Sequence, residues 1–409
     1  MNRKHMSWGR LSIAAHLLAS LLALPAQAEV SLTAAVDAAW QRAVVARTAI
    51  GEQRTAAAVA ESANRWWAEP PAISISHRDD RLNDNLGKRE SGVDLSLPLW
   101  LPGQRNAYGQ VATAGLAKAE AAQRAARWRI AGDVRESAWR VVALQAEVAK
   151  MATTADSLKR HAEDVSRRVK AGDLPRTDLL AAQAEQLAAR NRLGNAELQL
   201  REARQQWHTL TGLANLPQVA ELTETLPADM KVSADHPALQ EAASEVESAL
   251  RQFNLARKSH REAPELNVGW RHDVGGRGTS DENSIVVGVR LPFGTDARNK
   301  TMLARAEAAL DIARVTEQRQ REQLDTQAAT AREALTLAEL HAETTKEQAR
   351  LLRQRSDLLE RAFVAGELAL PECLRALAAA GEADAIAARQ QALLGLARAR
   401  LLQSLGLQP

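Results

Sequence analysis

The chain has 409 residues, of which 53 are Lys or Arg and 50 are Asp or Glu, so its formal net charge is +3. Arg3, Lys4 and Arg10 precede the apolar stretch 11–24 and a small-residue motif that ends at Ala28, which is the order of a secretory signal peptide. Cleavage after Ala28 would leave 50 basic and 50 acidic residues, a net charge of 50 − 50 = 0. The full chain has a basic isoelectric point, but the mature chain would be neutral. The isoelectric point therefore does not indicate nucleic-acid binding, and no nucleic-acid partner is expected.

The residues after this signal limit how the chain could meet a membrane. Cys373 is the single cysteine, so the chain forms no intramolecular disulfide. Glu29 follows the predicted cleavage site, which argues against an amino-terminal lipid anchor on the mature chain. No later run of 18 or more apolar residues is present, so a membrane would have to be crossed by strands.

Taken in order, the mature chain begins with an Ala-rich segment, 31–67, that predicts one helix ending before Pro70. Segment 72–99 then alternates apolar and polar residues on either side of a polar loop, which predicts a β-hairpin. A second hairpin of the same kind is expected at 264–292.

These four strands are long enough to cross a bilayer when tilted, and each has apolar side chains on one face only. An open sheet edge is not tolerated in lipid, and four strands are too few to close a barrel. Either the sheet stays in water or several copies of the chain share one barrel. Two readings also remain for the tryptophans of this region, which either form an aromatic belt at the membrane interface or pack in an ordinary core: Trp66, Trp67, Trp100 and Trp270.

Long helices are predicted between and after the hairpins. Segment 103–171 contains no proline and would form a helix of about 100 Å. It carries a seven-residue repeat of apolar residues that the returning helix, 176–212, answers with a seam of alanines, which predicts an antiparallel coiled coil.

The same plan occurs twice. Residues 168–182 resemble a segment within 361–376, and an offset of 194 takes Gly172 to Gly366 and Asp178 to Glu372. We therefore expect a signal peptide at 1–28, a first repeat at 29–213, a linker at 214–237 and a second repeat at 238–409, in which helices 297–365 and 370–406 follow the second hairpin. Between each pair of long helices, a glycine is expected to end the first helix in a left-handed conformation.

With its repeat, paired strands and tip motif R-x-x-x-G-x-x-S/T-x-x-D-x-L-x-A, the chain resembles the TolC-type outer-membrane efflux factors. The first tip matches at Arg168, Gly172 and Asp178, although Thr177 supplies its hydroxyl two places late. Segment 291–299 looks most like the heavy-metal efflux branch. The resemblance implies an α+β membrane protein in which three copies share a twelve-stranded β-barrel in outer-membrane lipid, continued by long helical hairpins as an α-barrel in the periplasm.

The family closes its tunnel at the helical tip, so the resemblance assigns Asp178 and Glu372 to a gate or an acidic ring. A carboxylate in the first turn of a helix also stabilises the helix dipole by about 0.3–1 kcal/mol, and this could be its whole role. Arg375 stands where some members carry a second acid, which argues against a strongly cation-attracting ring.

The sequence contains no recognisable enzyme motif, and no catalytic residue, cofactor or dedicated metal site is expected. The seven histidines of the mature chain lack the paired spacing of a metal cage. The leading hypothesis is a passive trimeric exit duct that works with a periplasmic adaptor (membrane fusion) protein and an inner-membrane efflux pump, with metal cations as a candidate cargo. The alternative is a periplasmic adaptor or coiled-coil scaffold, although an adaptor normally has one helical hairpin rather than two.

Overall fold

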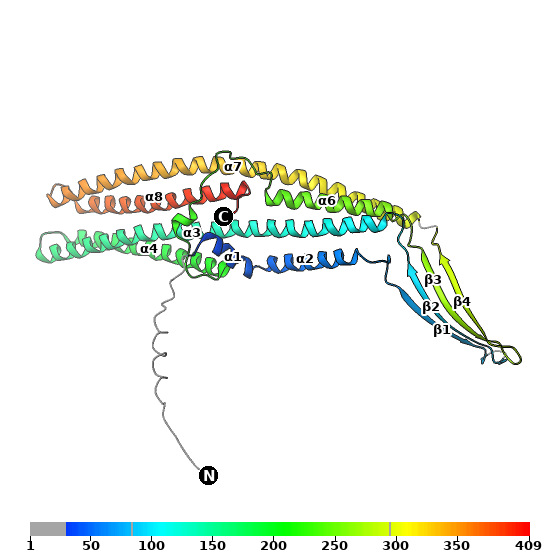
Figure 1. Ribbon diagram of the computed structural model, residues 1–409. Helices are drawn as coiled ribbons and strands as arrows, with labels where there is room; N and C mark the ends of the chain where they lie inside the picture. The colour runs from blue at the N-terminus through cyan, green and yellow to red at the C-terminus, as the bar shows by residue number, and fades with distance from the viewer. Residues whose placement is uncertain (1–29, 83–84, 294–295) are drawn as a thin grey trace, which may run out of the picture.

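The computed structural model describes residues 30–82, 85–293 and 296–409 and shows a rod of helices that carries a small β-sheet at one end (Figure 1). The predicted signal peptide at 1–28 lies outside the described residues. In chain order the elements are α1 (Leu32–Arg42), α2 (Val44–Ser62), β1 (Ala72–Asp79), β2 (Arg89–Pro98), α3 (Gln104–Ala171), α4 (Arg176–Thr211), α5 (Val219–Leu222), α6 (Pro237–Lys258), β3 (Glu265–Val274), β4 (Glu282–Arg290), α7 (Asp296–Val364) and α8 (Leu370–Ser404).

The two predicted hairpins join into one antiparallel sheet with the strand order β1-β2-β3-β4. The joint is the β2–β3 pair, which runs from Arg89 opposite Val274 to Pro98 opposite Glu265. This long register places the two repeats side by side. β1 and β4 are left at the edges of the sheet, each with one neighbouring strand in the chain.

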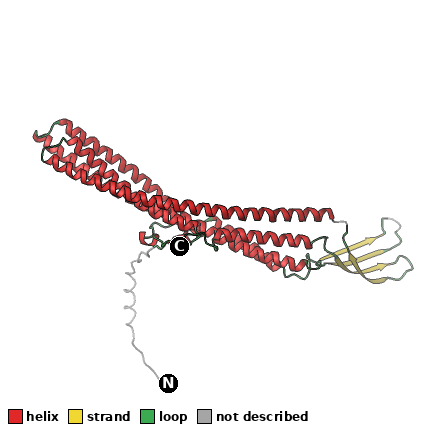
Figure 2. Ribbon diagram, turned by 90° about the horizontal axis from the view of Figure 1, so that it is seen from above, coloured by secondary structure: helices red, strands yellow, loops and turns green. Residues whose placement is uncertain are grey.

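The helices form a layer in the same lateral order as the strands. α4 and α2 contact one side of α3, while α8 and α6 lie between α3 and α7 (Figures 1 and 2). The short helices stack along the two long ones, α3 of 68 residues and α7 of 69 residues. At about 1.5 Å per residue, each long helix spans about 100 Å, which is why the molecule is a rod.

Small side chains hold these helices close together. On α4 the alanines predicted to form a seam, Ala182, Ala189, Ala196 and Ala203, are all buried. A core near the middle of the rod gathers larger side chains, among them Val134, Val141 and Trp207. Buried alanines let helix axes approach, and the larger apolar side chains supply the area that stabilises the pairing.

The single helix predicted at 31–67 is wrong in two respects, because the chain breaks at Ala43 and α2 ends at Ser62. Ala43 adopts an extended backbone with φ −70° and ψ 134°. The break separates α1, which packs on both α3 and α4, from α2, which runs along α3. Because neither glycine nor proline lies at this position, the break depends on tertiary packing and has no local sequence signal.

A buried arginine fastens the linker between the repeats to the long helix. Arg135 of α3 is 2% exposed. Its guanidinium donates to the Glu224 carboxylate (Nε to Oε2, 2.8 Å), to Gln403 Oε1 of α8 (2.6 Å) and to the Leu407 carbonyl (3.1 Å). One side chain therefore ties together α3, the linker and the carboxyl-terminal end of the chain.

His236 marks the point where the linker enters α6. Its side chain is buried, and its Nδ1 accepts a hydrogen bond from the Ala238 N–H at 3.1 Å. Burial lowers the pKa of His236, which keeps the ring neutral and able to accept this capping bond. The ring also lies edge-on to Trp128 of α3, with 4.7 Å between centroids.

In the part of the chain that the structure describes, no helix combines the length and the apolar character needed to cross a membrane.

Replacing Arg135 with Ala should lower the free energy of unfolding by about 3 kcal/mol, because Glu224 would lose its buried partner. Chemical denaturation followed by circular dichroism measures this change. Arg129→Ala is the matched control, since Arg129 also pairs with a carboxylate, Glu241, but is half exposed and should cost less than about 1 kcal/mol. Equal losses in the two variants would contradict a central role for Arg135.

Candidate functional site

The helical tip of the first repeat is a tight turn built on one glycine. Gly172 has φ +88°, a left-handed conformation that only glycine adopts at little cost. Its N–H bonds to the Val169 carbonyl at 3.2 Å, and the Asp173 N–H bonds to the Arg168 carbonyl at 2.9 Å. These bonds satisfy the last carbonyls of α3, and the chain reverses into α4.

The second tip repeats this backbone pattern. Gly366 has φ +80°, and its N–H bonds to the Phe363 carbonyl at 3.0 Å, while the Glu367 N–H bonds to the Ala362 carbonyl at 2.9 Å. Every partner is shifted by 194 residues from its counterpart in the first tip. The sequence repeat is therefore also a repeat of hydrogen bonds.

Both predicted gate carboxylates lie in the first turn of a returning helix. The Asp178 N–H bonds to the Pro175 carbonyl at 3.1 Å, and the Glu372 N–H bonds to the Ala369 carbonyl at 3.2 Å. Asp178 is half-buried, whereas Glu372, Thr177 and Arg375 are exposed. This position is compatible with the dipole role and with a gate, so geometry alone does not choose between them.

Two contacts that the sequence did not predict join the tips of the two repeats. The Arg168 guanidinium lies 5.8 Å from the centroid of the Phe363 ring, and its Nε lies 3.0 Å from Asp164 Oδ2. About two turns back toward the amino-terminal end of α3, His161 Nε2 lies 3.3 Å from Glu360 Oε1 of α7. The first and second hairpins are thus linked by side chains that have no shared sequence motif.

Below these contacts the tip is a small apolar core. Leu158 and Val165 of α3, Ala182 of α4 and Leu374 of α8 are buried together in one cluster. Cys373 of α8 is also buried, and burial, together with the charge of Glu360, raises the pKa of its thiol. A high thiol pKa disfavours the reactive thiolate, so Cys373 is an inert packing residue.

The sheet at the opposite end has one apolar and one polar face. The register places Ile73, Leu95, Val268 and Val287 in one row across all four strands. Residues in one row point to the same side of a sheet, and rows two residues apart repeat on that side. The complete apolar face consists of Ile73, Ile75, Val93, Leu95, Leu97, Leu266, Val268, Trp270, Ile285, Val287 and Val289.

These apolar side chains are exposed within the chain. Ile75 is 81% exposed, Ile285 is 77% and Val287 is 66%. A run of exposed β-branched side chains on one face is unfavourable in water and marks a surface that another apolar phase or a partner covers.

The opposite face is polar and lined by small residues. Its rows include Ser74, Asp94 and Gly269. An ion pair crosses it between Arg271 Nε and Glu90 Oε1, 3.0 Å apart. This face can border water.

The predicted interface tryptophans lie at two levels. Trp66, which is 83% exposed, and Trp67 precede the sheet at its helical end, where the Trp100 Nε1–H donates to the Arg65 carbonyl at 3.4 Å. Trp270 instead lies on the apolar face toward the loops, where it is stacked on His272 with 6.0 Å between centroids. The exposed ring of Trp66 favours the interface reading for that residue.

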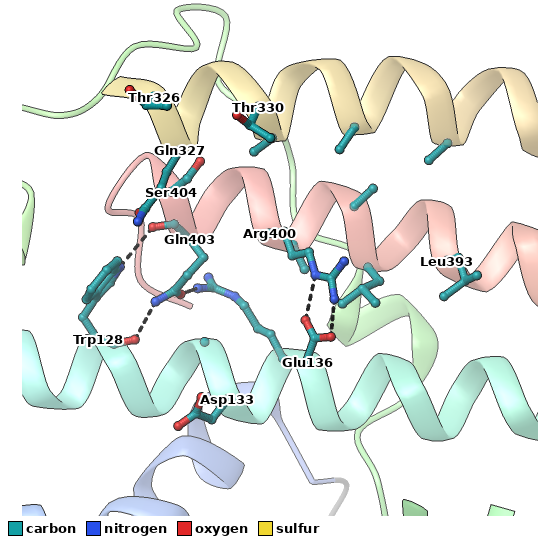
Figure 3. A pocket seen from close by; sticks show the side chains of 18 residues that line it. Trp128, Asp133, Glu136, Thr326, Gln327, Thr330, Leu393, Arg400, Gln403 and Ser404 are labelled. Atoms are coloured by element: carbon teal, nitrogen blue, oxygen red, sulfur yellow. Dashed lines mark hydrogen bonds and ion pairs between the residues drawn. The ribbon is translucent and has the colours of Figure 1, made fainter. Parts of the chain in front are cut away.

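A groove of about 820 Å³ lies between α3, α7 and α8 near the middle of the rod (Figure 3). Several of its polar side chains pair with one another: Gln403 exchanges two hydrogen bonds with Trp128, and Arg400 bonds to the Glu136 carboxylate. The pKa of Asp133 is raised by burial and by the nearby charge of Glu136. Because Gln403, Arg400 and Glu136 are engaged in these contacts and the remaining lining includes alanines, the groove is best described as a seam between helices.

Among the described residues, no group of three or more His, Cys, Asp and Glu side chains is arranged to hold a metal ion. The features available for function are therefore the two-faced sheet and the paired helical tips.

Comparison with known proteins finds a family model that matches part of the chain and solved structures that share its fold. Residues 33–213 match the family model described as outer membrane efflux protein. The chain is 31% identical over 234 residues to the cobalt-zinc-cadmium resistance protein CzcC of Cupriavidus metallidurans. That alignment covers 55% of this chain and 55% of the relative, so it spans about half the length of CzcC.

Solved structures share the fold over nearly the whole chain. A crystal structure of CusC, from work on transmembrane channel formation, superposes with a TM-score of 0.77 at 16% identity and covers 93% of each chain. The outer membrane protein VceC of Vibrio cholerae gives a TM-score of 0.75 at 16% identity, over 92% of this chain and 96% of VceC. At these identities the likeness shows the fold alone: long helices and four antiparallel strands, as predicted.

Replacing Arg168 with Gln should loosen the contact between the two tips, because Gln carries no charge to place over Phe363. Spin labels at positions 173 and 367 would report a broader distance distribution. Arg167→Gln is the matched control, since Arg167 also pairs with Asp164 (3.0 Å) but is 70% exposed. Identical distributions in both variants would contradict a link through Arg168.

Proposed function

We propose that the chain is an outer membrane efflux protein, as the family model matched by residues 33–213 describes, and that it is the outer-membrane channel of a tripartite efflux system. In this proposal three copies form a passive exit duct that catalyses no reaction. The sheet lies in the outer membrane and the helical rod extends into the periplasm, where a periplasmic adaptor and an inner-membrane pump meet the tip. The observation that carries the proposal is the four-stranded sheet with one exposed apolar face, one polar face and two unpaired edges.

The unpaired strand edges support a shared barrel. In lipid each unsatisfied backbone group costs several kcal/mol, so β1 and β4 need partners. A neighbouring copy can supply β4 to pair with β1, and three copies give twelve strands, enough to close a barrel whose polar face lines a water-filled bore.

The helical layer has open sides that match those of the sheet. β1 follows α2, and β4 precedes α7, so the copy that pairs with a strand edge also brings a helix edge alongside. These edge helices carry exposed apolar side chains, including Leu180 (58%) and Leu187 (57%) on α4 and Ile312 (67%) and Leu358 (60%) on α7. Contact between α7 of one copy and α2 and α4 of the next would bury both sets.

The arrangement of the two helical tips supports a duct that is closed at this end and can open. Asp178 and Glu372 stand at equivalent positions of the two hairpins, and the hairpins touch through Arg168 and Phe363. In a trimer this pair of carboxylates occurs three times around one axis. We assign them to closure of the duct, with Gly172 and Gly366 forming the turns.

Metal cations are the proposed cargo. CzcC, a relative over about half of its length, is named for resistance to cobalt, zinc and cadmium. The polar face of the sheet presents the carboxylates of Asp94 and Asp273, beside the ion pair of Glu90 with Arg271, and carboxylates that line a bore favour hydrated cations. The pump, rather than the duct, would select among them.

Replacing Val287 with Arg should abolish stable membrane trimers, because it places a charge on the apolar face at a cost of about 2–4 kcal/mol per copy. Val286→Arg is the matched control: it is the adjacent valine of the same strand, but the register places it on the polar face with Asp94 and Gly269. Heat-sensitive trimers in the outer-membrane fraction are measured by gel electrophoresis. Soluble wild-type monomers in the periplasm would overturn the proposed function.

Replacing Asp178 with Ala should raise the ion conductance of reconstituted channels several-fold if its carboxylate helps to close the tip. Asp173→Ala is the control, because Asp173 is exposed in the turn itself, outside α4. Unchanged conductance together with a small loss of stability, up to about 1 kcal/mol, would assign Asp178 to the helix dipole alone.

A further inference from the structure

A polar row borders the apolar face of the sheet on the side of the loops. The register aligns His77, Ser91, His272 and Asn283 across β1, β2, β3 and β4. This row lies two residues beyond the row of Ile75, Val93, Trp270 and Ile285, so its side chains project from the apolar side of the sheet, about 7 Å further along the strands.

Hydrogen bonds within the row hold both imidazole rings. His77 Nδ1 lies 3.0 Å from Ser91 Oγ, and His272 Nδ1 lies 3.0 Å from Asn283 Oδ1. The His272 ring is also stacked on Trp270, with an interplanar angle of 7°. One ring nitrogen of each histidine thus contacts a neighbour inside the row, and the other ring nitrogen has no hydrogen-bond partner among the described residues.

The next row outward adds charge. It contains Asp79, Arg89 and Val274. Asp79 is compensated by Arg81, whose Nε lies 3.7 Å from Asp79 Oδ2, while Asp281 lies just before β4. Arg89 is exposed and forms no ion pair within the described residues. The border therefore offers one guanidinium and two imidazoles next to an apolar band.

We propose that this border, formed by His77, His272 and Arg89, binds the phosphate groups of anionic lipids. The inference rests on the proposed function, because only a membrane-inserted sheet has lipid against its apolar face. Acyl chains would cover the band of Ile, Val and Leu, and the headgroup phosphate would then lie level with the row. The Arg89 guanidinium binds phosphate oxygens in strong, charge-assisted hydrogen bonds, an imidazole N–H turned toward the headgroup adds a further hydrogen bond, and amphipathic rings are favoured at this depth. In a trimer the row would occur three times around the barrel.

The test is native mass spectrometry of the full trimer taken from bilayers of phosphatidylcholine mixed with phosphatidic acid. Wild type should retain phosphatidic acid in preference to phosphatidylcholine. The double variant His77→Asn, His272→Asn should show a weaker preference for phosphatidic acid, because it removes both imidazole rings from the row. His341→Asn, which changes an exposed histidine on α7 far from the sheet, is the control and should behave as wild type.

Arg89→Gln provides a second variant that keeps the histidine row intact, and it should also lower the preference. An unchanged preference in either variant that forms trimers overturns the proposal. Displacement of the lipid by excess inorganic phosphate would also overturn it, since the row would then bind free phosphate rather than a headgroup. Trimers that insert but show no lipid preference contradict only this inference, whereas a wild-type chain that does not insert contradicts the proposed function.

Discussion

Unpaired backbone groups at the two edges of the sheet are the constraint on which the rest of the structure depends. β1 and β4 each have one neighbouring strand, while the apolar side chains between them face outward. In water such a sheet would expose both an apolar surface and two open edges, and in lipid its edges would be unsatisfied. A wall closed by further copies of the chain removes both problems at once.

The helices follow from the same constraint. Because the lateral order of the helices matches that of the strands, the open sides of the sheet continue along the rod as the free sides of α2 with α4 and of α7. Alanine seams keep the helices of one copy in a thin layer rather than a compact bundle. A thin layer whose two sides expose apolar side chains can curve into a tube. In a compact bundle those side chains would already be buried.

Duplication explains why the two tips resemble each other, but it does not explain the side-chain contact that joins them. The backbone bonds around Gly172 recur around Gly366 with an offset of 194 residues. By contrast, Arg168 contacts Phe363, which corresponds to Val169 in the first repeat, so the pair has no symmetric counterpart. The sequences of the two halves have therefore diverged where the halves touch each other. The Arg168–Phe363 contact between the two hairpins depends on this difference.

The sequence by itself determined the periodic features. The offset of 194, the heptads of the long helices, the alternation in 72–99 and 264–292 and the glycines of the tips are all local patterns, and they predicted the fold class correctly because each element has its own period or turn signal. The local tip pattern also singles out Arg168, Asp178 and Glu372, whose roles are proposals.

Only the tertiary structure decided how these elements meet. The break at Ala43, the buried Arg135–Glu224 pair, the Arg168–Phe363 contact and the histidine row each join segments that are distant in sequence or packed on different partners. His77 and His272 lie 195 positions apart in the sequence. Neither segment contains a local pattern that predicts the register in which β2 pairs with β3, and this register aligns the two histidines. Register and packing are set by contacts across the whole molecule, which is why no window of the sequence contains them.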